Sequence, residues 1–158
     1  MRWQCGPPRN RFAFDESNIA GQAVGDRLAS RSIDRGLPDM SEGKSILIVE
    51  DEAMIGMMLE DYLDALGYRL HAVAATVDEA CAHAREGGFD AALVDCNLQG
   101  EKSWPVADIL AQQDIPFIFA TGGMADDLPH GHADRPTLAK PFTIGAVERA
   151  LGRVLGTA

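Results

Sequence analysis

Apolar residues in the second part of the chain form two kinds of run, and the two kinds alternate. Continuous apolar runs predict buried strands at Ser45–Val49, Tyr68–Ala74, Phe89–Val94, Ile115–Ala120 and Thr137–Ala139. Runs with helical spacing predict helices at Met54–Leu66, Val77–Ala84, Ser103–Gln113 and Ile144–Leu155. Between Thr121 and Pro136, two prolines and three glycines predict that any helix is short or irregular.

This alternation predicts one α/β domain with a doubly wound, five-stranded parallel sheet in three layers, α/β/α. Strands that are apolar throughout need cover on both faces of the sheet, and the intervening helices supply it. Ligands of such folds bind beyond the carboxyl ends of the strands, where the strand order reverses. The polar residues at those ends are therefore the candidates for function.

Residues 1–44 differ from the rest, because they are rich in Gly, Pro, Ser and charged residues. We expect this segment to be a mostly disordered N-terminal extension, followed by a compact domain at residues 45–158. An alternative stays open: Met40 lies just before the compact domain, and translation starting there would leave the first 39 residues unmade.

The charge is concentrated in the compact part. Residues 45–158 hold seven Lys and Arg against eighteen Asp and Glu. This balance argues against direct nucleic-acid binding, which needs a basic surface. No run of about 18 apolar residues is present, and the first ten residues lack the apolar run of a signal peptide. We therefore expect a soluble, cytoplasmic protein without a membrane or nucleic-acid partner.

Four of the five predicted strands end in residues that carry chemistry. The first strand is followed by Glu50 and Asp51, the third by Asp95, the fourth by Thr121 and the fifth by Lys140. Because the carboxyl ends of parallel strands meet at one edge of the sheet, we expect these acids, the hydroxyl and the ammonium to converge.

This set of groups suits phosphoryl transfer with a divalent ion. Mg²⁺ prefers hard oxygen ligands, and its binding relieves the repulsion between neighbouring carboxylates. Asp95 can then act as the nucleophile, because carboxylates form aspartyl phosphates. Lys140 and Thr121 would hold the phosphoryl oxygens.

Each of these residues alone also has an ordinary explanation. Glu50 and Asp51 would serve as a cap and dipole partner for the helix that begins near Ala53. His130 and His132 have a spacing compatible with a metal site, but a solvated polar loop is the expectation there. The joint placement of the strand-end residues favours a functional site.

Residues 45–158 resemble the receiver domain of bacterial two-component response regulators. The resemblance rests on the acidic pair Glu50–Asp51, the acceptor Asp95, the hydroxyl Thr121 and the motif Lys140–Pro141–Phe142. It implies a flavodoxin-like strand order, 2-1-3-4-5, and a histidine kinase or histidine phosphotransfer protein that donates a phosphoryl group to Asp95. It also implies Mg²⁺ bound by Asp51, Asp95 and the backbone carbonyl of Asn97, with Glu50 helping through water.

Residues Phe119–Ala120–Thr121–Gly122 resemble a subfamily of receivers that is frequent in alphaproteobacteria and often paired with kinases of the HWE type. Asn97 and Gly123 occupy positions that tune the lifetime of the phosphoryl group in the family. One position departs from the family pattern, because Thr137 stands where most receivers have a switching Tyr or Phe. We therefore expect Thr121 to draw Gly122–Pro129 inward on phosphorylation instead.

Only "GTA" follows the last predicted helix, so we expect a stand-alone receiver. Such a protein signals through contacts with an unknown output protein or acts as a phosphate sink. It would be a signalling protein and not an enzyme, apart from catalysing its own phosphotransfer and autodephosphorylation. Two alternatives stay open: a pseudo-receiver that binds partners without phosphorylation, and an aspartate-nucleophile phosphatase. The phosphatase is disfavoured because the acceptor of such enzymes follows their first strand, whereas Asp95 follows the third predicted strand.

Overall fold

A computed structural model describes residues 43–123 and 128–157 of the chain, all of which belong to one unit, Gly36–Ala158. The expected N-terminal extension lies outside the described residues except for Gly43 and Lys44. Within the part that is described, no helix is both long enough and apolar enough to span a membrane.

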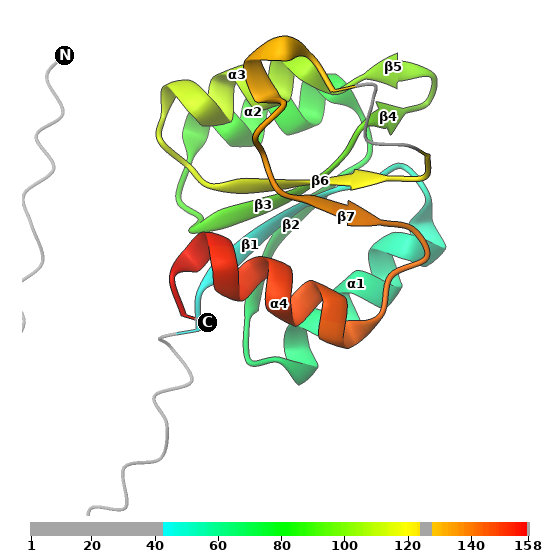
Figure 1. Cartoon of the computed structure of the whole chain (residues 1–158), viewed down its shortest axis with the longest axis vertical. Helices are drawn as coiled ribbons and strands as arrows, with labels where there is room; N and C mark the ends of the chain where they lie inside the picture. Colours follow the sequence, from blue (N-terminus) through cyan, green and yellow to red (C-terminus); the bar gives the residue numbers. More distant parts are fainter. Residues whose placement is uncertain (1–42, 124–127, 158) are drawn as a thin grey trace, which may run out of the picture. The chain divides into compact units, whose positions relative to one another are not determined.

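Five parallel strands form the main sheet, in the order β2-β1-β3-β6-β7 (Figure 1). The elements are β1 (Ser45–Val49), α1 (Ala53–Ala65), β2 (Arg69–Ala74), α2 (Val77–Glu86), β3 (Ala91–Asp95), β4 (Asn97–Leu98), β5 (Glu101–Lys102), α3 (Trp104–Gln112), β6 (Phe117–Thr121), the 3₁₀ helix η2 (His130–His132), β7 (Thr137–Ala139) and α4 (Ile144–Leu155). The predicted α/β fold and its 2-1-3-4-5 strand order are confirmed, since β6 and β7 are the fourth and fifth strands of this sheet.

The helices cover both faces of the sheet, with α2 and α3 on one face and α1 and α4 on the other (Figure 1). Each face has its own core. Phe117, Phe119 and Leu110 belong to the core on the α2–α3 face. Ile118 and Leu151 belong to the core on the α1–α4 face. Alternate residues of β6 thus serve opposite cores, which explains why the whole strand is apolar.

Local chemistry sets the helix boundaries. Gly67 ends the α1 segment with φ of 78°, a conformation that glycine adopts without a Cβ penalty. Thr76 caps α2 by accepting a hydrogen bond from the Glu79 N–H at 3.2 Å, and the Glu79 carboxylate accepts one from the Ala75 N–H at 3.0 Å. Thr143 caps α4 by accepting a bond from the Ala146 N–H at 3.3 Å.

Several predicted boundaries differ from the structure. The third strand begins at Ala91 and not at Phe89, because Asp90 turns its carboxylate to accept a hydrogen bond from the Ser45 N–H at 2.7 Å. The short antiparallel pair β4–β5 was not predicted, since strands of two residues leave no periodic signal. Ser103 lies at the N-cap position of α3, but its side chain makes no capping hydrogen bond.

Among the described residues between β6 and β7, which exclude 124–127, there is one 3₁₀ turn, His130–His132, consistent with the predicted short or irregular helix. The expectation of a solvated polar loop is wrong for His132, which is 6% exposed. Its ring packs edge-on against Phe117 and Phe119. Its Nε2 atom lies 2.8 Å from Oδ1 of Asp108 on α3.

Candidate functional site

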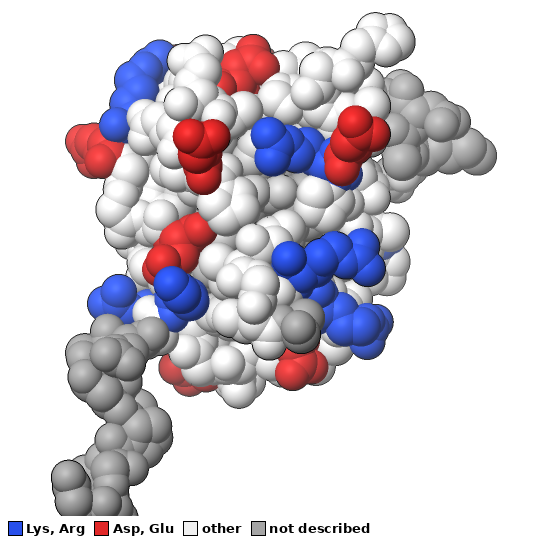
Figure 2. Space-filling model, turned by 60° about the vertical axis from the view of Figure 1, so that its left-hand side comes forward, with Lys and Arg blue, Asp and Glu red and all other residues white. Residues whose placement is uncertain are grey.

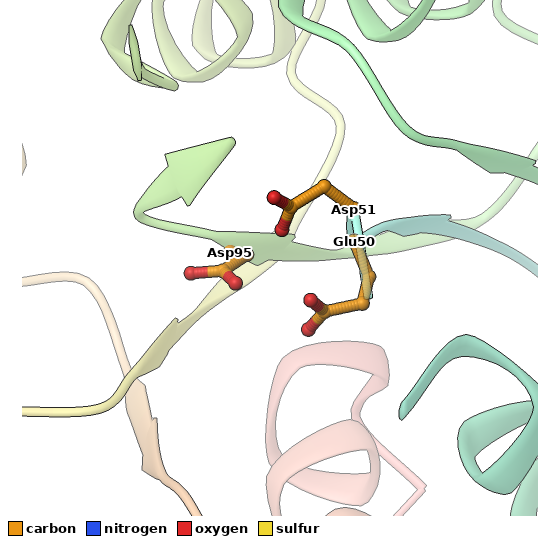
Figure 3. A group of neighbouring side chains, drawn as sticks. All are labelled: Glu50, Asp51 and Asp95. Carbon is orange, nitrogen blue, oxygen red and sulfur yellow. The ribbon is translucent and has the colours of Figure 1, made fainter. Parts of the chain in front are cut away.

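Three carboxylates meet where β1 and β3 end side by side. Glu50 and Asp51 follow β1 directly, and Asp95 is the last residue of β3. The two strands pair in parallel up to Val49 opposite Val94, so both end at the same edge of the sheet. One oxygen from each acid lies within 4.8 Å of those from the other two (Figure 3).

The ammonium group of Lys140 lies between two of these acids. Its Nζ atom is 2.6 Å from Asp95 Oδ2 and 2.9 Å from Glu50 Oε2. Glu50 is 2% exposed and Asp95 is 7% exposed, so both ion pairs lie largely out of water. The backbone N–H of Lys140 donates to the Thr121 carbonyl at 2.8 Å, which fixes the start of the Lys140–Phe142 motif beside the end of β6.

Burial and charge act in opposite directions on this cluster. Burial raises the pKa of Glu50 above its ordinary value of 4.5, although the Lys140 ammonium and the Glu52 N–H lower it. Burial alone would lower the pKa of Lys140, but the hydrogen bonds and charges of Asp95 and Glu50 outweigh it and raise that pKa. Lys140 is therefore held firmly in its charged form.

Besides the Glu52 N–H, which donates to Glu50 Oε1 at 3.1 Å, two backbone N–H groups from the segment that follows β3 donate to the acids. The Asn97 N–H donates to Asp95 Oδ1 at 3.1 Å. The Gln99 N–H donates to Asp51 Oδ2 at 2.9 Å. Gln99 could not be identified from the sequence, since a backbone N–H is carried by almost any residue type and leaves no signal there.

Asp51 and Asp95 open onto a depression of about 320 Å³ on the surface. Its lining residues come from all the segments that follow β1, β3, β6 and β7, and they are Asp51, Glu52, Asp95, Asn97, Gln99, Gly100, Gly122 and Lys140. The depression is polar and accessible, and it is large enough for a phosphoryl group and the end of a partner's side chain.

Neither the protein-family models nor the curated proteins gave a match to this chain. Solved structures do match it. SdrG from Sphingomonas melonis Fr1 is 51% identical, with a TM-score of 0.65, over 72% of this chain and 97% of that one. Its BeF3-activated conformation is also solved, with a TM-score of 0.62.

The REC domain of the response regulator PhyR from Erythrobacter litoralis is 32% identical, with a TM-score of 0.63, over 72% of this chain and 91% of that one. This chain belongs to the receiver-domain family of response regulators. A more distant member is the receiver domain of the sensor histidine kinase PA1611 from Pseudomonas aeruginosa PAO1, which is 27% identical. That match has a TM-score of 0.60 and covers 72% of this chain and 98% of that one, whose structure holds a magnesium ion in the active-site cleft.

Within this receiver domain, the predicted site residues occupy the carboxyl edge of the sheet. Glu50, Asp51, Asp95 and Lys140 are brought into one cluster. Thr121 is the last residue of β6, one position beyond the residue that pairs with Asp95.

The remaining predicted positions lie around this cluster. Asn97 and Gly122 line the depression, whereas Gly123 is not among its described lining residues. Thr137 is the first residue of β7 and is exposed. The expected moving segment, Gly122–Pro129, is described only at Gly122, Gly123, Leu128 and Pro129, because residues 124–127 lie outside the described part.

Proposed function

We propose that this receiver domain is phosphorylated on Asp95 by a histidine kinase, in particular one of the HWE type, or by a histidine phosphotransfer protein. One observation carries this proposal. The Asp95 carboxylate is held between the Lys140 ammonium at 2.6 Å and the Asn97 N–H at 3.1 Å, and it faces an accessible depression. It is thus oriented and accessible as a nucleophile.

The donor set fits a hard divalent cation. Three carboxylates and one ammonium leave two negative charges in the cluster, which one divalent cation balances. We assign Asp51, Asp95 and the Asn97 backbone carbonyl as ligands of Mg²⁺, and Glu50 as a ligand acting through water. When bound, Mg²⁺ supplies positive charge against the phosphoryl oxygens.

Asp95 performs the chemical step. One of its carboxylate oxygens forms a bond to phosphorus while the bond from phosphorus to the imidazole nitrogen of the donor's phosphohistidine breaks. The electron pair of that bond stays on the imidazole. Lys140 is already paired with Asp95, so its ammonium is in place to bind a phosphoryl oxygen. The Thr121 hydroxyl, at the end of the neighbouring strand, would bind another.

Phosphorylation would then change the conformation of the segment that follows β6. We propose that Thr121 draws the following glycines inward, since Thr137 cannot act as the usual aromatic switch. We also assign Asn97 and Gly123 to the lifetime of the phosphoryl group; Asn97 lines the depression beside Asp95.

We propose that the phosphorylated domain either signals through a contact with an output protein or acts as a phosphate sink. Although the domain is acidic, the face shown in Figure 2 carries several separate groups of Lys and Arg side chains among its Asp and Glu side chains. A groove of about 180 Å³ between β7 and α4 is lined by Thr137 and by Arg149 and Arg153. An acidic protein surface is the partner that this charge would attract.

Incubation of the full chain with acetyl phosphate and Mg²⁺, followed by intact mass measurement, tests the proposal. We expect a gain of one phosphoryl group that EDTA and Asp95→Asn abolish. Asp90→Asn is the matched control, because Asp90 also accepts a backbone hydrogen bond near a strand but lies outside the cluster. No gain in the parent protein, together with no response to beryllofluoride, would contradict the proposal and favour a pseudo-receiver.

A further inference from the structure

The turn between β4 and β5 holds a residue in an unfavourable backbone conformation. Gln99 has φ of 50° and Gly100 has φ of 88°. Tight hairpin turns of two residues require positive φ at both positions, and Asn or Gly are usual there. A glutamine side chain disfavours this conformation, so its presence calls for a reason beyond the turn itself.

This conformation directs the backbone N–H of Gln99 toward the acidic cluster. Its backbone N–H donates to Asp51 Oδ2 at 2.9 Å, although the two residues are 48 positions apart in the chain. Its side-chain Nε2 donates to the Ala75 carbonyl, just after β2, at 3.4 Å. The side chain therefore braces the turn against the neighbouring loop while the backbone contacts the carboxylate.

We propose that Gln99 is a positioning residue for cation binding, which holds the Asp51 carboxylate in the orientation that the cation requires. This role rests on the proposed cation site at Glu50, Asp51 and Asp95. The N–H occupies one oxygen of Asp51 and fixes the carboxylate plane, and the amide brace fixes the N–H. Outer-shell partners of this kind are known to set metal affinity.

Replacing Gln99 with glycine distinguishes the positioning of Asp51 from the formation of the turn, because the two roles predict opposite effects on stability and Mg²⁺ affinity. Gln99→Gly relieves the unfavourable φ and is expected to raise the melting temperature by about 3 °C. It also removes the brace, so the Mg²⁺ dissociation constant is expected to increase about tenfold. Gln99→Ala keeps the N–H and removes only the amide, and the same loss of affinity is expected without the thermal gain.

Mg²⁺ titration of the full chain, followed by the fluorescence of Trp104, measures these affinities. Trp104 begins α3, directly beyond this hairpin. The sequence has two tryptophans, so Trp3→Phe provides the parent background. Gln113→Ala is the matched control, because the Gln113 amide also donates to a backbone carbonyl, that of Arg85 at 3.2 Å, but far from the acids.

Weaker Mg²⁺ binding by both Gln99 variants, with a melting temperature that does not fall in Gln99→Gly, supports the proposal. Mg²⁺ affinity within twofold of the parent in both variants overturns it and leaves Gln99 as an ordinary turn residue. A parent protein that shows no Mg²⁺ binding overturns the cation site itself, and with it this role.

Discussion

At the scale of single residues, the acidic cluster is a compromise between stability and function. Glu50 is almost completely buried, and its pKa is raised chiefly by that burial. A buried carboxylate beside Asp95 would be costly without Lys140, which pairs with both acids. Binding sites commonly keep such unfavourable groups because their chemistry requires them.

The raised pKa of Glu50 predicts a specific pH dependence of stability. Between the ordinary value of 4.5 and the higher folded value, the folded protein binds more protons than the unfolded chain. In the presence of EDTA, the free energy of unfolding should therefore fall as the pH rises through this window. Urea unfolding across pH 4.5–7 measures it, and Glu50→Gln should remove this part of the slope.

Glu60→Gln, which changes an exposed acid of α1, serves as the control and should keep the slope of the parent. Mg²⁺ should reverse the trend in the parent, because a cation at the cluster favours ionised Glu50. Equal slopes in the parent and Glu50→Gln would show that Glu50 titrates at its ordinary pKa.

The sequence also shows which site residues can be predicted and which cannot. Glu50, Asp51, Asp95 and Lys140 were predictable because each follows an apolar strand, and parallel strands end at a common edge. Gln99 was not predictable, because it acts through its backbone N–H and a left-handed conformation. Neither a backbone N–H nor a left-handed conformation at a glutamine can be recognised from the residue type.

At the scale of elements, the alternation of apolar runs predicted the five strands of the main sheet and the four described α-helices, and the resemblance to receiver domains implied the order of the strands. What it missed depends on contacts between distant parts of the chain. The start of the third strand was predicted two residues too early, at Phe89, since Asp90 uses its carboxylate to accept a hydrogen bond from Ser45 at the start of β1. His132 was misjudged because its partners lie on α3 and β6.

These partners make His132 the anchor of the segment between β6 and β7. His132→Ala removes a buried ring from between α3 and β6 and should lower the free energy of unfolding by about 2–3 kcal/mol. His132→Phe keeps a ring but loses the bond to Asp108, and should cost about 1 kcal/mol. Urea unfolding measures both values.

A double-mutant cycle isolates the contact between the two side chains. His132→Phe and Asp108→Ala should cost less together than the sum of their separate effects, because both remove the same hydrogen bond. Asp61→Ala, an exposed acid on α1, is the control and should add independently to His132→Phe. Full additivity with Asp108→Ala would mean that the contact contributes nothing to stability.

At the scale of the whole molecule, every described core residue lies between Ile46 and Leu151. All the described strands and helices likewise lie between Ser45 and Leu155, beyond the first 39 residues. A chain shortened to residues 40–158 should keep the melting temperature and the rate of phosphorylation by acetyl phosphate. Scanning calorimetry and intact mass measurement check this, and a lower value of either would assign a role to the N-terminal segment.

We propose that the edge of the sheet where the three acids meet Lys140 is a phosphoryl acceptor centred on Asp95. The most direct test is to treat the full chain with phosphoramidate and Mg²⁺, reduce the acyl phosphate with borohydride, and locate the resulting homoserine by peptide mass spectrometry. We predict homoserine at position 95 alone, dependent on Mg²⁺. Homoserine at another acid, or at none while the untreated protein binds Mg²⁺, would contradict this assignment.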